Sequence, residues 1–105
     1  LILGITFKEN CPDMRNTKIL DVYTELISFG ANVDVFDSVA NKKEVKNELQ
    51  IDLITDYTKK QYSTIILGVA HDDFKAIDFK QLHNDSAMIF DTKSFIDTKY
   101  IDGRL

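Results

Sequence analysis

Cysteine and glycine are scarce in this chain of 105 residues, and each shortage excludes a class of structure. The single cysteine cannot form an internal disulfide, so nothing indicates an oxidising compartment. Of the four glycines, only Gly4 lies near the end of the first apolar run, where a dinucleotide-binding turn would need G-x-G-x-x-G. No apolar run is long enough to cross a membrane and no signal peptide is visible, so we predict a cytoplasmic protein that does not bind membranes.

Charge and length narrow the class further. The net charge of −4 argues against a nucleic-acid binder, although a nucleotide needs only a local cationic pocket. Hydrophobic residues make up 44% of the chain and charged residues 29%, which is typical of a globular domain with one core. The chain opens at Leu1, inside a strand-like run and without an initiator methionine. We therefore expect a single domain, residues 1–105, cut from a longer protein.

The hydrophobic pattern alternates between strand-like and helix-like segments. Apolar runs predict strands at residues 1–7, 32–36, 64–69 and 87–90, with a short edge strand at 51–54. Helical spacing predicts helices at 17–29 and 40–49, with shorter ones at 56–61 and 76–83, and an irregular tail at 91–105. This alternation predicts an α/β fold, a Rossmann-like three-layer sandwich with a mainly parallel sheet.

The segment between the first predicted strand and helix is longer than a turn requires. It holds Lys8 and Arg15, and it ends at Asn16-Thr17, which are good helix-capping residues. An arginine opposes the dipole at the start of a helix, so its position there calls for a functional explanation. Two cations beside free backbone N–H groups suit a ligand with phosphates. An anion-binding site and ordinary surface charges are the two interpretations of Lys8 and Arg15, and any function is expected to lie in this segment.

Two side chains allow a chemical and a structural interpretation. Asp37, after the second strand, lies where a dinucleotide-binding fold often keeps an acid for the ribose. Since the glycine-rich turn is missing, we favour a structural role for Asp37 as a turn residue. Cys11 near a helix start could be a nucleophile. It has no histidine close in sequence, so a structural thiol is favoured.

The two histidines are weighed in the same way. His71 precedes Asp72 and Asp73, which makes a metal site conceivable. Adjacent carboxylates rarely converge on one ion, so a loop or capping role is favoured and no metal is predicted. His83 near a helix end is interpreted as a dipole partner or a surface residue.

Several motifs together resemble the C-terminal domain of nucleotide-sugar 6-dehydrogenases, the UDP-glucose and GDP-mannose dehydrogenase family. They are GITFKENCPDMRNTK at 4–18, GANVDVFD at 30–37, GVAHDDF at 68–74, IFDTK at 89–93 and DGRL at 102–105. The first motif is most similar to the branch that oxidises UDP-N-acetylhexosamines for bacterial surface polysaccharides.

The resemblance implies a two-step oxidation of a sugar C6 alcohol to a carboxylate, with two NAD molecules reduced. It implies a longer enzyme with an N-terminal domain that binds most of the NAD, a central dimerising region and this substrate-binding domain. Such an enzyme would be a homodimer or a larger assembly. The family's catalytic cysteine lies upstream and Cys11 does not match it, so no catalytic residue is expected here and the isolated domain should be inactive.

Residue by residue, Phe7 and Lys8 match positions that contact the nucleotide-sugar in the family. Arg15 matches an arginine that reaches the NAD pyrophosphate. Lys93 lies where some relatives place a substrate-contacting arginine, and Arg104 could add a cation. Two alternatives stay open: a non-catalytic receiver or flavodoxin-like module, and a packing domain without a ligand. A receiver would need acidic residues after its first strand, where Phe7 and Lys8 stand.

Overall fold

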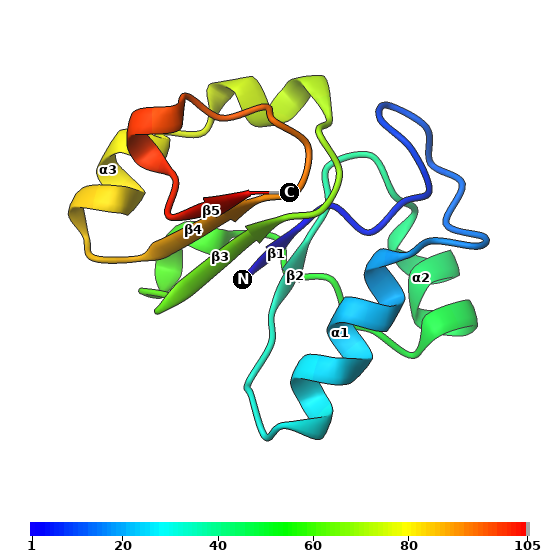
Figure 1. Ribbon diagram of the computed structural model, residues 1–105. Helices are drawn as coiled ribbons and strands as arrows, with labels where there is room; N and C mark the ends of the chain where they lie inside the picture. The colour runs from blue at the N-terminus through cyan, green and yellow to red at the C-terminus, as the bar shows by residue number, and fades with distance from the viewer. Residues whose placement is uncertain (105) are drawn as a thin grey trace.

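The computed structural model, which describes residues 1–104, is built around one sheet of parallel strands in the order β2-β1-β3-β4-β5 (Figure 1). The strands are β1 (Ile2–Leu3), β2 (Val35–Phe36), β3 (Thr64–Leu67), β4 (Met88–Asp91) and β5 (Gly103–Arg104). The helices are α1 (Ile19–Ser28), α2 (Lys42–Leu49) and α3 (Phe79–Asn84), with 3-10 turns η1 (Tyr57–Lys59), η2 (Asp72–Ala76) and η3 (Thr98–Tyr100). The predicted α/β fold with a parallel sheet is confirmed.

Helical segments cover both faces of the sheet, as the predicted three-layer arrangement requires. The helices α1 and α2 pack on one face, where Ile2, Val35 and Val45 share a buried cluster. The segments η2, α3 and η3 cover the other face, where Leu3 and Leu67 belong to a second cluster. Alternate strand residues enter opposite clusters, which is the period-two pattern of a strand buried on both faces. No helix in residues 1–104 is long and apolar enough to span a bilayer.

The first strand was predicted at residues 1–7, and every side chain from Leu1 to Thr6 is buried. Regular pairing nevertheless covers only Ile2–Leu3, because Gly4 takes a positive φ of 92° and turns the chain. A Cβ at Gly4 would lie 2.7 Å from Val69 Cβ and 2.9 Å from Val69 N. Glycine is therefore required both by the left-handed backbone and by the close approach of the chain after β3.

Helix α1 begins two residues later than predicted, because Thr17 caps it from the position before the N-cap residue. Thr17 Oγ1 accepts a hydrogen bond from the Ile19 N–H at 3.3 Å, while Lys18 occupies the N-cap position without a side-chain cap. The helix ends as predicted at Gly30, which has a φ of 88°. Hydrogen bonds from Gly30 N to Ile27 O and from Ala31 N to Leu26 O complete a Schellman ending.

Two predictions about the sheet edges were wrong. Residues 51–54 form no strand, although Ile54 N donates to Val35 O on the free edge of β2 at 2.9 Å. The tail is not irregular, since it forms η3 and then the edge strand β5. Gly103 lets β5 approach β4, because a Cβ there would lie 2.6 Å from the Phe90 ring. Leu105, the last residue of the predicted tail and of the DGRL motif, lies outside the described residues.

The strand order contains a topological switch point between β1 and β3. The connection after β1 leads to α1 on one face, and the connection after β3 leads to η2 and α3 on the other (Figure 1). In open α/β sheets such a switch point is where ligands bind. The segments that reach it here are the β1–α1 loop, residues 4–18, and the β3–η2 connection, residues 68–71.

Gly4→Ala is expected to lower the free energy of unfolding by about 2–5 kcal/mol, the sum of a left-handed alanine and an overpacked contact. Gly30→Ala is the matched control, because its φ is also positive but nothing lies within 4 Å of the added Cβ. It should cost only about 1–2 kcal/mol. Urea unfolding of both variants measures the difference, and equal losses would contradict a steric role for Val69.

Candidate functional site

Hydrogen bonds to its own backbone carbonyls fold the β1–α1 loop onto itself. Phe7 N donates to Asp13 O at 2.7 Å, and the Lys8 carbonyl accepts from Thr6 Oγ1 at 3.1 Å. Asn10 and Asn16 adopt positive φ values of 59° and 61°, which asparagine tolerates better than most residues. The loop therefore has a defined, compact backbone conformation and is not an extended linker.

The folded loop leaves its predicted ligand-binding side chains at the surface. Lys8 is exposed, and Phe7 is 55% exposed although it is a large apolar residue. Within residues 1–104 the side chain of Lys8 forms no ion pair. An aromatic ring beside an uncommitted cation can contact a sugar-nucleotide and its phosphates without rearrangement of the protein.

A buried carboxylate, that of Asp37, joins the ends of three strands. It accepts hydrogen bonds from Ile5 N at 2.7 Å, from Val39 N and Ala40 N at 2.8 Å, and lies 3.0 Å from His71 Nε2. Burial pushes the pKa of Asp37 upward, but these hydrogen bonds outweigh it and hold the pKa below its usual value. The predicted turn role is confirmed by the bonds to Val39 and Ala40.

His71 takes a part in the site that sequence reasoning missed. It occupies the N-cap position of η2, in keeping with the loop or capping interpretation, yet its side chain makes no capping bond. The fully buried ring instead lies between Asp37 and Asn10, whose N–H is 2.9 Å from Nδ1. Nothing in the sequence spacing pairs residue 71 with residues 10 and 37; only the parallel order of β2, β1 and β3 brings them together. No metal-binding group occurs among residues 1–104.

Lys93 reaches the same edge of the sheet through a second loop held by a buried carboxylate. Asp91, at the end of β4, accepts from Lys93 N at 2.8 Å, Phe95 N at 2.7 Å and Ile96 N at 2.8 Å. Lys93 Nζ then lies 4.0 Å from Glu9 Oε1 of the β1–α1 loop. The structure therefore brings Lys93 next to the loop that carries Phe7 and Lys8.

Arg15 lies on another part of the loop, where it is held by its neighbour. Its Nε and Nη2 bond Asp13 at 3.0 and 3.1 Å, and its side chain is 84% exposed. The paired guanidinium keeps the pKa of Asp13 below its usual value. Arg15 lines a hollow of about 500 Å³ with Asn41 and Glu44 at the start of α2, whereas Lys93 meets the loop at Glu9.

The remaining candidates have structural surroundings. Cys11 is a free, half-buried thiol in the β1–α1 loop. His83 lies in the last turn of α3, with its Nε2 4.0 Å from Asp102 Oδ1. Arg104 Nη2 donates to Ser94 Oγ at 2.8 Å, which ties β5 to the Lys93 loop.

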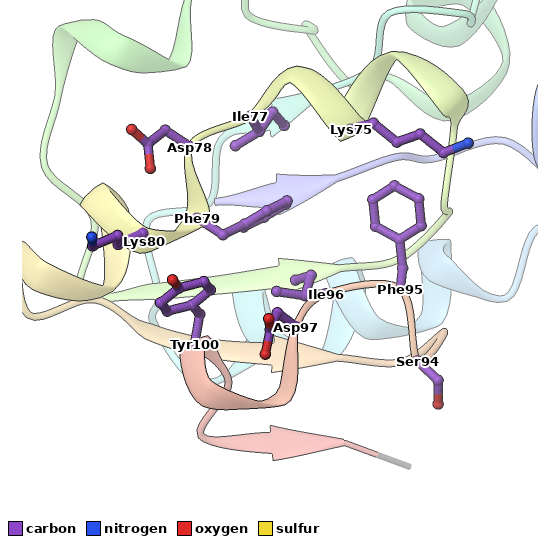
Figure 2. Close-up of a pocket in the computed structure, with 10 residues that line it drawn as sticks. All are labelled: Lys75, Ile77, Asp78, Phe79, Lys80, Ser94, Phe95, Ile96, Asp97 and Tyr100. Atoms are coloured by element: carbon purple, nitrogen blue, oxygen red, sulfur yellow. The ribbon is translucent and has the colours of Figure 1, made fainter.

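An open groove of about 520 Å³ lies on the opposite face from α1 and α2 (Figure 2). Figure 2 shows Phe79 and Tyr100 at one end and Phe95 with Ser94 at the other, and Lys75 and Lys80 on the η2–α3 wall. None of Phe7, Lys8 and Arg15 lines it. Size alone therefore does not identify the functional site, and we place the candidate site at the switch point, where Lys93 lies beside the β1–α1 loop that carries Lys8.

The strand order, with its switch point between β1 and β3, defines a doubly wound α/β domain, a fold that commonly binds ligands. The sequence profile of the UDP-glucose/GDP-mannose dehydrogenase family, UDP binding domain, matches residues 1–98. The chain belongs to this family. The family match decides against the receiver alternative, although the observed strand order also occurs in receiver and flavodoxin-like domains.

Similar proteins share this chain as one part of a longer sequence. UDP-N-acetyl-D-glucosamine 6-dehydrogenase of Salmonella typhi is 39% identical over 108 residues, which cover all of this chain and 25% of that protein. Protein CapL of Staphylococcus aureus is 39% identical over 99 residues, covering 92% of this chain and 23% of that protein. The structure of a UDP-D-ManNAc dehydrogenase from Pyrococcus horikoshii shares the fold, with a TM-score of 0.72 and 18% identity over 98% of this chain and 24% of that one. The chain thus spans about a quarter of the length of these relatives.

Asp37→Asn should lower the free energy of unfolding at pH 7 by about 3–5 kcal/mol, because an amide nitrogen would face the donors Ile5 N–H and His71. The charged Asp37 adds stability that is fully present above its unfolded pKa of about 3.9 and is lost as the pH falls through the lower folded pKa. The variant should therefore lose less stability than the native chain on acidification from pH 5. Urea unfolding across pH tests this, with the exposed Asp52→Asn as control; parallel pH curves for Asp37→Asn and the native chain would contradict it.

Proposed function

We propose that this chain is the substrate-binding domain of an NAD-dependent UDP-sugar 6-dehydrogenase, with a UDP-N-acetylhexosamine as the sugar. The observation that carries the proposal is the family match over residues 1–98, together with the exposed Phe7–Lys8 pair in the loop at the switch point. The relative named for UDP-N-acetyl-D-glucosamine supports the choice of sugar, and the product would serve surface polysaccharide synthesis.

In this proposal the loops at the carboxyl edge of the sheet grip the nucleotide. Lys8 and Lys93 would neutralise the diphosphate from two loops, and the Phe7 ring would cover an apolar face of the ligand. Binding energy from the nucleotide, remote from the reacting carbon, would hold the sugar C6 against the groups that oxidise it. The domain's share of catalysis is positioning, and the thiol that reacts with the sugar belongs to another part of the enzyme.

The residues present fit a secondary contact with NAD and not a complete NAD site. Two of the five Arg15 donors are used by Asp13, so three N–H groups stay available for a pyrophosphate. The turn after β1 lacks the glycines that would let a dinucleotide approach the backbone. An N-terminal domain would hold most of the NAD, which when bound accepts hydride from C6. The full enzyme would act in the cytoplasm as a homodimer or larger assembly.

Titration of the chain with UDP, GDP and NAD, followed by amide NMR shifts, tests the nucleotide site. UDP should shift residues 7–17 selectively, and Lys8→Ala should raise the Kd for UDP about tenfold or more, the size of a lost charge-assisted hydrogen bond. Lys80→Ala, in the groove of Figure 2, is the matched control and should leave the Kd unchanged. A loss in Lys80→Ala instead of Lys8→Ala would move the site to the groove, and unchanged affinity in both would refute the role of Lys8. No shift of the native chain with any of the nucleotides would favour a packing domain.

In the full-length dehydrogenase, Lys8→Ala and Arg15→Ala should affect different substrates. Lys8→Ala should raise KM for the UDP-sugar about tenfold with little effect on KM for NAD, because it removes a contact to the sugar-nucleotide alone. Arg15→Ala should do the reverse. Steady-state kinetics with each substrate varied in turn measures the split, and equal effects on both substrates would refute the assignment of these two roles.

A further inference from the structure

We infer that His71 is the positioning residue of the nucleotide-binding loop, and that it acts as a neutral imidazole whose bare Nδ1 accepts the Asn10 backbone N–H. This inference rests on the proposed function only for its consequence for UDP binding. The geometry that carries it is a fully buried ring that bridges the end of β2, the end of β3 and the middle of the β1–α1 loop.

The hydrogen-bond partners of His71 permit one proton arrangement. The Asn10 N–H, 2.9 Å from Nδ1, can only donate, so Nδ1 must carry a lone pair. The Asp37 carboxylate, 3.0 Å from Nε2, accepts, so Nε2 must carry the proton. Thr6 Oγ1 lies 3.3 Å from Nε2 and gives its own hydrogen to Lys8 O, which leaves it an acceptor toward His71 as well. Each partner therefore specifies the same tautomer.

Within residues 1–104, the recorded contacts of the His71 ring include one charged group. Asp37 is the titratable group that contacts it, from the segment after β2. The β1–α1 loop presents Thr6 and the Asn10 backbone, and η2 presents the Phe74 ring at 5.3 Å between centroids. Asp37 holds the donor nitrogen Nε2 of His71, and the acceptor nitrogen Nδ1 faces the β1–α1 loop.

His71 contacts the loop at Asn10, a residue whose backbone conformation is unfavourable for most side chains. Asn10 has a left-handed backbone, and its side-chain Oδ1 accepts from Asp72 N at 2.8 Å. His71 and Asp72 thus bind Asn10 through its backbone and through its side chain. Cys11 N, next along the chain, donates to Lys8 O at 3.4 Å, so the clamp on Asn10 also fixes the turn that carries Lys8.

Two conservative variants separate the two nitrogens of the ring. In His71→Asn the Oδ1 atom occupies the place of Nδ1 and can still accept the Asn10 N–H, but the donor to Asp37 is lost. In His71→Gln the Nε2 amide can follow the path of the ring Nε2 to Asp37, but the acceptor for Asn10 is lost. The inference predicts that the loop stays ordered around Asn10 in His71→Asn and loses this order in His71→Gln, whatever each variant loses in overall stability.

The experiment is amide hydrogen exchange by NMR on the ligand-free 105-residue chain and both variants. Exchange at Asn10 should accelerate about tenfold or more in His71→Gln relative to His71→Asn, after correction for global stability with the core amides of Ile65 and Ile89. Equal protection of Asn10 in the two variants, or faster exchange in His71→Asn, would overturn the inference.

A second measurement needs no variant. Long-range 1H–15N correlation spectra of the native chain should show His71 protonated at Nε2 and bare at Nδ1, and a protonated Nδ1 would overturn the inference. In the UDP titration, His71→Gln should weaken binding more than His71→Asn does. If the native chain binds no UDP, the proposed nucleotide site fails in the isolated domain, while the exchange result still decides the role of His71.

Discussion

The carboxylate of Asp37 is the interaction on which the functional edge of this domain depends. It receives backbone N–H groups from the end of β1 and from the turn after β2, and it orients the histidine that follows β3. Three parallel strands are thereby joined at their carboxyl ends by one buried charge. Burial makes the charge costly, and the four hydrogen bonds offset that cost, so removal of any donor leaves a poorly solvated carboxylate.

The same construction recurs at β4 and gives the site its geometry. Asp91 accepts from three backbone N–H groups of the loop after β4, as Asp37 accepts from two after β2, and so directs Lys93 toward the β1–α1 loop. The negative charges that shape the edge of the sheet are buried and paired with backbone, whereas Lys8, Arg15 and Lys93 remain at the surface. Of these cations, Arg15 pairs with Asp13 and Lys93 lies near Glu9, whereas Lys8 forms no ion pair within residues 1–104.

The sequence predicted features that depend on local pattern and missed those that depend on tertiary contact. The period of apolar residues located the two longer helices and the central strands, and Gly30 marked the end of α1. Strand β5 could not be read from Asp102-Gly103-Arg104, since its only local signal is a glycine that fits against Phe90. The loop with Phe7 and Lys8 was chosen as the candidate site from its length and charge, and its ligand contacts stay a prediction. The role of His71 was not, because its partners at positions 10 and 37 become neighbours only through the strand order.

The two buried aspartates hold their loops mainly by backbone N–H groups, and this has a consequence for how such a domain can change over time. A carboxylate that accepts backbone N–H groups does not depend on the side chains of the residues that it binds. Replacements at Phe7, Lys8 and Lys93 can accumulate without disturbing the frame, because none of these side chains supplies a bond to Asp37 or Asp91. Divergence in ligand preference among descendants of this fold is thereby separated from divergence in stability.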